Sequence, residues 1–217
     1  MSEDSTALPA DEVLTEDGLA ASGNGRILII ACGALAREIM ALKEQNGWDH
    51  MDLQCLPAKL HLFPDQIPDA VEAAVKAVGF KYSEVFVAYA DCGTGGLLQA
   101  RCEGLGVKMI AGPHCYSFFD GNDAFAAKGD TEMRAFYLTD FLVRQFDAFV
   151  WKPMGLDRHP DLLAIIFGNY TTVIYLAQTD DPVLDALAER AADRMGLRFE
   201  RRFTGYGDLK PALARHA

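Results

Sequence analysis

Apolar runs of strand length alternate with helical patterns between residues 26 and 112, and this alternation limits the possible folds most strongly. The runs are residues 26–31, 51–56, 84–90 and 107–112. The segments between them place apolar residues on one face of a helix. Since strands joined by helices pair in parallel, the pattern predicts an α/β fold: a mostly parallel, Rossmann-like doubly wound sheet with helices on both faces.

Two further strands are predicted beyond residue 112. Residues 170–178 are rich in β-branched side chains, and residues 198–203 follow a well-formed helix that begins with Asp181 as its cap and Pro182 at its first position. A helix is also expected from about Thr139 to Trp151. We therefore expect residues 26–217 to form a single α/β domain.

The segment Met1–Gly25 is acidic and contains neither Lys nor Arg. Such a composition is typical of disorder, so residues 1–25 are predicted to be a disordered acidic tail. The tail also lacks the basic start and apolar core of a secretory signal. Together with five cysteines, an odd number without a CxxC pair, this indicates a reduced, cytoplasmic location.

Charge and hydropathy exclude several classes of partner. The formal net charge is -11 and the pI is about 4.8. The one basic run, Arg198–Phe203, is too short to bind phosphates cooperatively, so neither nucleic acid nor an anionic membrane surface is expected as a partner. The longest apolar runs have strand length, and no transmembrane span is predicted.

Cysteine and histidine follow successive predicted strands. Cys32 ends the first strand, His61 follows the second, Cys92 ends the third and Cys115 follows the fourth. Because the carboxyl ends of parallel strands meet at one edge of a sheet, these side chains are expected to converge. Thiolate and imidazole ligands suit Zn²⁺ or an iron–sulfur cluster, so the four residues are the predicted metal ligands.

The residues leave several kinds of site open. A closed set of four ligands would make a structural zinc site, whereas an open position would make a reactive zinc or a cluster with one unique iron. There are two alternatives. The thiols only pack a turn, or Cys32 or Cys92 is a metal-free nucleophile activated by His114. Either His61 or His114 could be the fourth ligand. The remaining two thiols, Cys55 and Cys102, are predicted to be buried apolar residues.

Candidate acid and base groups are His114, Asp91 and Glu38. Asp91 could orient a histidine, although an acidic residue in this position more often caps a helix. Glu38 could act near the first turn or lie on a solvated helix face.

Glycines in the same turns are candidates for binding a cofactor or anion through backbone amides. They are Gly33, Gly93, Gly95 and Gly96. The stretch CGTGG lacks the Lys-Ser/Thr of a P-loop and does not match GxGxxG, which disfavours a nucleotide.

Several of these stretches together resemble a family of bacteria and archaea catalogued as domain of unknown function 1638. The matching stretches, which span about Ile27 to Asn169, are ACGALAREI, KLHLFP, AYADCGTGG, PHCYSFFDG and FYLT. Two positions depart from the family pattern: His114 stands where an acidic residue often precedes the third cysteine, and Ala90 replaces a glycine.

The resemblance implies a metabolic setting. Members of this family look to be encoded near corrinoid-dependent methyltransferases of the trimethylamine type and their corrinoid carriers. This implies a metal- or cluster-binding protein of one-carbon metabolism, with a small-molecule substrate and a corrinoid protein or methyltransferase as partner. An enzyme that transfers a group at a thiolate-bound metal and an accessory cofactor-binding protein both fit, and the oligomeric state stays open.

Overall fold

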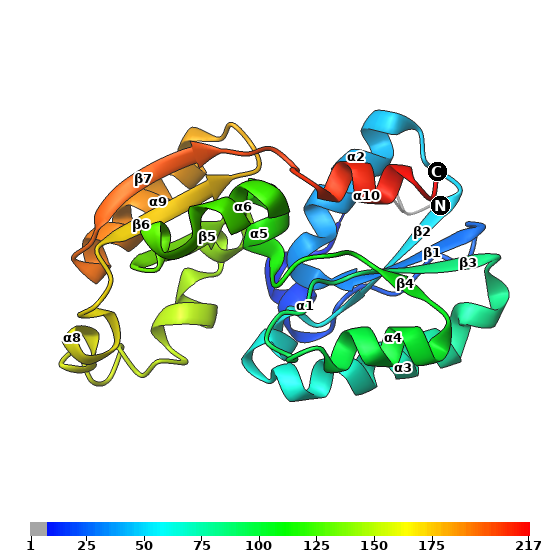
Figure 1. The fold of residues 1–217 in the computed structure, drawn as a ribbon, viewed down its shortest axis with the longest axis horizontal. Coiled ribbons are helices and arrows are strands. Elements are labelled where there is room, and N and C mark those ends of the chain that lie inside the picture. Colours follow the sequence, from blue (N-terminus) through cyan, green and yellow to red (C-terminus); the bar gives the residue numbers. More distant parts are fainter. Residues whose placement is uncertain (1–7) are drawn as a thin grey trace, which may run out of the picture. The chain divides into compact units, whose positions relative to one another are not determined.

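The computed structural model describes residues 8–217, apart from the side chains of residues 130 and 131. Its chain divides into two compact units, Met1–His114 with Lys210–Ala217, and Cys115–Leu209 (Figure 1). Each unit contains one sheet of parallel strands, so the predicted α/β class is confirmed. The strands form two sheets instead of the one expected, and the single folding domain stays a prediction.

The first sheet has four parallel strands in the order β2-β1-β3-β4. The strands are β1 (Ile27–Cys32), β2 (Met51–Leu56), β3 (Glu84–Ala88) and β4 (Lys108–Met109). Every residue of β1 is buried, because β1 pairs with β2 on one side and with β3 on the other. All four strands were predicted, although β4 is shorter than its apolar run.

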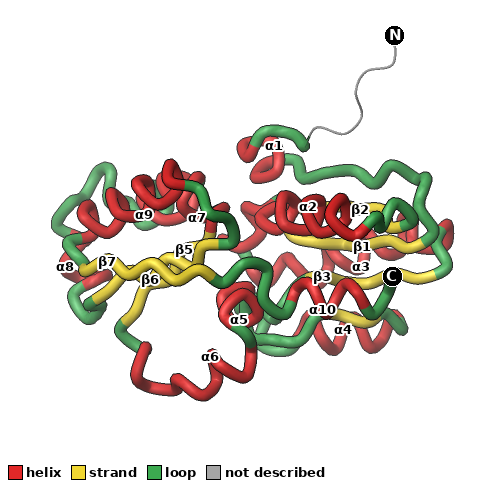
Figure 2. The backbone as a smooth tube through the Cα atoms, turned by 90° about the horizontal axis from the view of Figure 1, so that it is seen from above, coloured by secondary structure: helices red, strands yellow, loops and turns green. Residues whose placement is uncertain are grey.

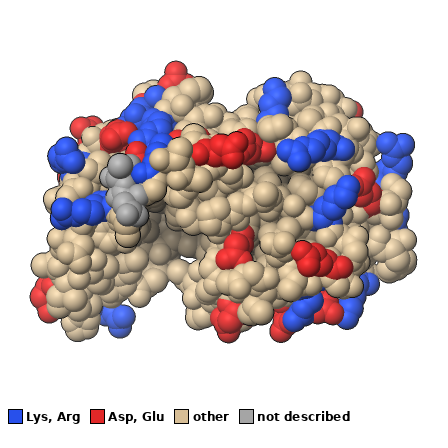
Figure 3. All heavy atoms as spheres, in the orientation of Figure 1, with Lys and Arg blue, Asp and Glu red and all other residues tan. Residues whose placement is uncertain are grey.

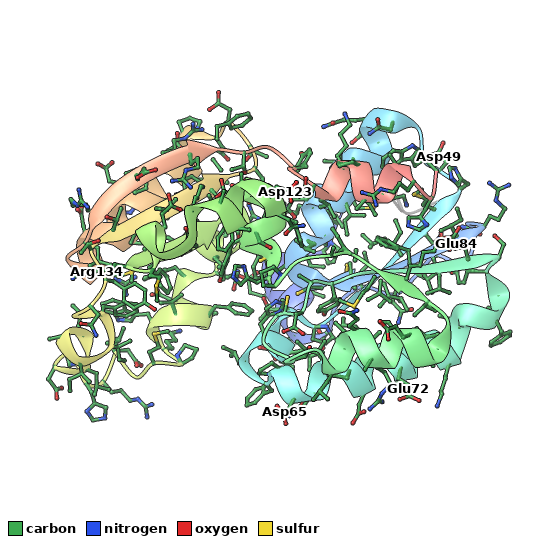
Figure 4. The ribbon with its side chains drawn as sticks, in the orientation of Figure 1. Asp49, Asp65, Glu72, Glu84, Asp123 and Arg134 are labelled. Atoms are coloured by element: carbon green, nitrogen blue, oxygen red, sulfur yellow. The ribbon has the colours of Figure 1, made fainter. Side chains whose placement is uncertain are left out.

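Helices cover both faces of this sheet. On one face α3 (Ile67–Val78) and α4 (Leu97–Leu105) lie side by side, and on the other α2 (Ala36–Asn46) lies beside the last residues of α10 (Leu209–Ala214) (Figures 1 and 2). Arg101 of α4 donates to Asp69 at 2.8 Å and also to Glu72, which Figure 4 labels on α3.

Short helical turns connect the main elements. They are η1 (Gly33–Leu35), η2 (Ala58–Leu62), η3 (Pro64–Gln66), η4 (Gly79–Lys81), η5 (Gly129–Glu132) and the π-helical turn η6 (Asp147–Trp151).

The C-terminal residues of the chain are fixed to the first sheet. Nδ1 of His216 lies 2.6 Å from a carboxylate oxygen of Glu84, which Figure 4 labels near the start of β3. The His216 ring also stacks on Phe86, with 4.2 Å between ring centroids. The last residues therefore belong to the first unit although the preceding strand belongs to the second.

The second sheet has the order β5-β6-β7, with β5 (Ala135–Thr139), β6 (Thr172–Ala177) and β7 (Arg198–Phe203). Its helices are α5 (Cys115–Asp120), α6 (Asn122–Lys128), α7 (Asp140–Arg144), α8 (Leu162–Phe167) and α9 (Pro182–Met195). Figure 2 shows α7 and α9 on one face of this sheet and α5 and α6 on the other. A buried core joins β5, β6 and α9 through Leu138, Val173, Tyr175 and Ala188.

Of the elements predicted in the second unit, the helix cap at Asp181 is confirmed and the long helix from Thr139 is wrong. Asp181 caps α9 by accepting from the Val183 amide at 2.8 Å, as predicted. The expected helix Thr139–Trp151 is instead split into α7 and the π-helical turn η6, and its first residue, Thr139, ends β5 and caps α7. Strand β5 itself was not predicted.

Residues 8–25 differ from the disordered tail that the sequence predicted. They form α1 (Asp11–Glu16) and an antiparallel bridge between Leu19 and Cys55. Leu14 is fully buried, and Asp11 accepts from Arg37 at 2.9 Å. The buried Leu14, the Asp11–Arg37 pair and the bridge to Cys55 together attach this segment to the first unit. Residues 1–7, the rest of the predicted tail, lie outside the described residues.

The basic run in β7 is compensated by acidic neighbours. Arg201 pairs with Asp180 at 2.7 Å and Asp185 at 2.6 Å, and Arg202 pairs with Glu132 at 2.9 Å. On the face in Figure 3, Lys and Arg side chains are interleaved with Asp and Glu. Within residues 8–217, none of the helices has the length and apolar character required to cross a bilayer.

Replacing Leu14 by alanine tests the packing of α1. Since Leu14 is 0% exposed, Leu14→Ala should lower the free energy of unfolding by about 2–5 kcal/mol. Val13→Ala is the matched control, because Val13 is 40% exposed and its loss should change stability by less than about 0.5 kcal/mol. Urea denaturation measures both, and equal effects would mean that α1 does not pack as described.

Candidate functional site

The carboxyl edge of the first sheet carries four of the predicted site residues. Cys32 is the last residue of β1, His61 lies in η2 after β2, Cys92 follows β3 and His114 follows β4. All four belong to the first unit. Cys115 is the first residue of the second unit, so its place in the predicted ligand set stays a prediction.

Cys32 and His61 are in contact. The Sγ atom of Cys32 lies 3.4 Å from Nδ1 of His61, and it accepts from the Ala34 amide at 3.4 Å. Cys32 is only 2% exposed, and this burial raises the pKa of its thiol to about 12, although the Ala34 amide acts to lower it. At neutral pH, Cys32 is therefore an un-ionised thiol in the metal-free protein.

His61 also interacts with Cys92. Burial acts to lower the pKa of His61, but a hydrogen bond to Cys92 and the charge of that group outweigh burial and raise it. The imidazole thus contacts Cys32 and lies near enough to Cys92, in the turn after β3, for that thiol to affect its pKa.

The backbone at Cys92 is strained. Its φ is 49°, and no other residue except glycine has a positive φ in the part of the chain that the structure describes. A side chain in this left-handed region costs free energy, and such residues are concentrated at functional sites. Cys92 is partly exposed, whereas Cys32 is buried.

Tyr89 is a functional candidate that the sequence analysis missed. It follows β3 directly, it is buried, and its ring stacks on that of His61 with 6.2 Å between centroids. Burial raises the pKa of Tyr89 far above its usual value, and the nearby Cys32, Cys92 and Cys55 raise it further. The hydroxyl therefore lies among the thiols of the first unit.

The Tyr89 hydroxyl lacks a hydrogen-bond partner of ordinary geometry among the residues described. Cys32 is near enough to influence its pKa, yet the pair does not meet hydrogen-bond geometry. An unsatisfied buried hydroxyl costs about 1–3 kcal/mol, so a bound ligand or a charged neighbour could recover this energy. A tyrosine just before an Asp-Cys turn is the one sequence signal that could have indicated it.

The glycine-rich turn wraps the carboxylate of Asp91. That carboxylate accepts from the Thr94 hydroxyl at 2.7 Å, the Gly95 amide at 3.0 Å and the Gly96 amide at 2.7 Å. Burial acts to raise the pKa of Asp91, but these hydrogen bonds outweigh burial and lower it. These bonds hold the glycine turn before α4 and do not cap that helix, whose N-cap is Gly96 without a side-chain hydrogen bond. The helix-cap alternative for Asp91 is therefore wrong, and anion binding by the amides of Gly93, Gly95 and Gly96 stays a prediction.

Gly33 is required by the approach of α1. A Cβ atom on Gly33 would lie 2.2 Å from the carbonyl oxygen of Leu14, so no larger residue fits there. Glu38 is 4% exposed, and its charge raises the pKa values of Cys32 and Cys55. The alternative of a solvated helix face for Glu38 is therefore wrong, and its role as acid or base stays a prediction.

The other predicted residues occupy ordinary positions. Cys55 and Cys102 are both buried, as predicted. Burial lowers the pKa of His114. Within residues 8–217, no group of three or more His, Cys, Asp and Glu side chains is arranged so that it could hold a metal ion. The donors in direct contact are Cys32 and His61.

A family model described as "Protein of unknown function (DUF1638)" matches residues 55–213. The chain belongs to this family. The match contains His61, Cys92, His114 and Cys115, and it begins after Cys32. Searches of curated proteins and of solved structures gave no significant match.

Asp91→Ala tests how the carboxylate holds the glycine turn. Removing the three hydrogen bonds that the carboxylate accepts should lower the free energy of unfolding by about 0.5–2 kcal/mol at pH 7. Because the pKa of Asp91 is lowered on folding, this contribution is present above the unfolded pKa of about 3.9 and is lost as pH falls through the folded pKa.

The measurement is urea denaturation of both proteins between pH 7 and pH 2. The stability difference should shrink at the acidic end. Asp65→Ala, which removes an exposed carboxylate of the same unit, is the control. A difference that stays constant down to pH 2 would contradict a role for the ionised Asp91 carboxylate.

Proposed function

We propose that the protein binds a thiophilic metal centre, Zn²⁺ or an iron–sulfur cluster, at the carboxyl edge of the first sheet. Cys32, His61 and Cys92 of the first unit are the proposed donors. The observation that carries the proposal is the contact between His61 and the buried thiol of Cys32. Sulfur and imidazole donors select such centres over Mg²⁺ or Ca²⁺.

The separation of the two donor atoms fits a shared ion. Zinc binds sulfur at about 2.3 Å and nitrogen at about 2.0–2.1 Å, so two such ligands of a tetrahedral ion lie about 3.5 Å apart. The Sγ atom of Cys32 and Nδ1 of His61 are 3.4 Å apart. The proposal includes a rotation of the Cys92 side chain toward this pair when the ion binds.

The burial of Cys32 also favours a ligand over a nucleophile. A thiol whose pKa is about 12 is almost entirely protonated at pH 7, and the protonated form is a poor nucleophile. A metal cation displaces the proton and supplies the opposite charge that a buried thiolate needs. The orphaned hydroxyl of Tyr89 lies beside the same sulfur and fits a site that changes its charge on binding.

We extend the proposal to one-carbon metabolism on the basis of the family resemblance. A thiolate-bound ion could hold an incoming thiol as thiolate or polarise a carbonyl group, which suits transfer of a methyl group. The substrate would be a small molecule, and the partner a corrinoid protein or a methyltransferase in the cytoplasm. His114, Glu38 and Asp91 are the acid–base candidates, and an accessory role without catalysis is the alternative.

Metal-free thiol chemistry is the second candidate function. Two observations favour it, the strained backbone of Cys92 and the interaction of Cys92 with His61. A thiol paired with an imidazole is the arrangement of a cysteine nucleophile and its base. In this case His61 replaces His114 as the base that the sequence suggested.

Elemental analysis and an absorption spectrum of protein purified without oxygen test the metal proposal. We expect about one zinc ion or one brown cluster per chain. Cys32→Ser and His61→Ala should each reduce the metal content to about one tenth or less, because each removes a donor from a shared ion. Cys102→Ser is the control, since Cys102 is buried in α4 and should leave the content unchanged. Full metal content in Cys32→Ser would remove Cys32 from the site.

Labelling of metal-free protein with iodoacetamide tests the second candidate. Cys92 should react faster than Cys115, a thiol of the same exposure class that serves as internal control. His61→Gln should slow labelling of Cys92 by about 10-fold or more, because general-base assistance typically contributes at least 100-fold. Mass spectrometry of peptides measures both rates, and equal rates at the two cysteines would exclude an activated Cys92.

A further inference from the structure

We propose that β7 is a pairing edge whose partner is β7 of a second copy of this chain, in antiparallel orientation. The pairing joins the two three-stranded sheets edge to edge, with a twofold axis at Arg201. It is independent of the metal proposal, because all of its residues belong to the second unit.

Strand β7 has an open side. It is the last strand in the order β5-β6-β7, and in the part of the chain that the structure describes no strand pairs with it on the side away from β6 (Figure 1). Arg198, Glu200 and Phe203 are exposed along it, and Phe203 is 60% exposed. An open edge of six residues is a template for a further strand.

The other sheet edges offer less. None of the residues of β5, at the opposite edge of the same sheet, is exposed. In the first sheet, β4 has only two residues, and the outer side of β2 is bridged at Cys55 by Leu19. Strand β7 is therefore the edge that a second chain can reach over the greatest length.

The backbone of β7 determines which residues can pair. The Thr204 amide, directly after the strand, donates to the carbonyl of Ala177 at 3.0 Å and so points toward β6. Backbone groups of successive residues in a strand point to opposite sides, so those of Phe199, Arg201 and Phe203 point to the open side. An antiparallel partner forms hydrogen bonds only where these three residues lie opposite their counterparts.

One register also matches the side chains. With Arg201 opposite itself, Phe199 lies across from Phe203 of the second copy. Glu200 then lies across from Arg202 of the second copy. Aromatic pairs and opposite charges directly across an antiparallel pair stabilise it, and like charges destabilise it. The two neighbouring registers place either Glu200 or Arg202 opposite itself, so the register centred on Arg201 is favoured.

The arginine on the twofold axis is already neutralised by its own chain. Arg201 pairs with Asp180 at 2.7 Å and with Asp185 at 2.6 Å. Glu200 lies 2.7 Å from Arg202 of its own strand, so pairing extends this contact into a row of alternating charges. Charged side chains on an edge strand commonly prevent uncontrolled pairing. Here they also select one register for the second copy.

Sedimentation equilibrium of the full chain at several concentrations tests the pairing. The wild type should show a monomer–dimer equilibrium. Phe203→Pro removes an N–H group on the open side and an aromatic contact, each at two symmetric positions, while the bonds to β6 remain. It should raise the dissociation constant of the dimer about 10-fold or more. Ile165→Ala, which shortens an exposed apolar side chain of α8, is the control and should leave the constant unchanged.

Reversing single charges on β7 tests the register. Glu200→Arg places two arginines across from each other at two symmetric positions, so it should raise the dissociation constant about 10-fold or more. Arg198→Glu is the matched control, because Arg198 lies across from Thr204 of the second copy and its reversal should have little effect. Both residues are exposed, so neither substitution removes a core side chain.

Three results would count against the pairing. A wild-type chain that sediments as a monomer at every concentration would overturn it. A dimer with the same dissociation constant in Phe203→Pro would show that the copies associate through another surface. Equal effects of Glu200→Arg and Arg198→Glu would overturn the register centred on Arg201.

Discussion

Parallel pairing of β1 on both of its sides is the constraint on which the candidate site depends. A strand paired with β2 and β3 satisfies its backbone groups internally, and all of its residues can then be apolar and buried. Parallel neighbours also return to the same end of the sheet through helices, so each strand releases its next turn at one edge. Residues distant in sequence, Cys32, His61 and Cys92, can share that edge for this reason.

The N-terminal segment covers the carboxyl edge of the first sheet next to Cys32. The carbonyl group of Leu14 lies so close to Gly33 that a Cβ atom there would collide with it, and Gly33 follows Cys32 directly. Helix α1 therefore covers the turn that carries the thiol. Burial is the main cause of the raised pKa of Cys32, so the properties of this cysteine depend on a segment that lies before the family match at residues 55–213.

The sequence predicted those elements whose signal is local. Strands β2 and β7 have the expected bounds. Strand β5 was missed although it has the same length as β3. Helix α1 was missed because one buried leucine, Leu14, does not stand out in an acidic stretch. The division into two sheets depends on pairing between distant strands, which the order of elements does not determine.

The site was predictable to a similar extent. Cys32 and His61 were expected to approach each other because both follow strands of one parallel sheet, whereas Asp91 holds the glycine turn and does not cap the helix as one alternative had it. The buried position of Glu38 needed the packing of α2, and the unsatisfied hydroxyl of Tyr89 needed the positions of all its neighbours. Hydrogen-bond satisfaction belongs to the folded structure, and no single residue pattern encodes it.

Unequal burial of the two thiols beside His61 has a further consequence for the ion. Ionising Cys32 creates a charge in a region of low dielectric, where Glu38 already disfavours negative charge. A metal ion with high positive charge and high affinity for sulfur compensates the cost of this buried thiolate. A hydrogen bond to an imidazole compensates less of it. The partly exposed Cys92 carries a smaller desolvation penalty, so it is the donor that can move without exposing a buried charge. In the proposed metal site, the asymmetry that makes Cys32 a poor nucleophile would also make it the fixed ligand, and Cys92 would be the donor that moves.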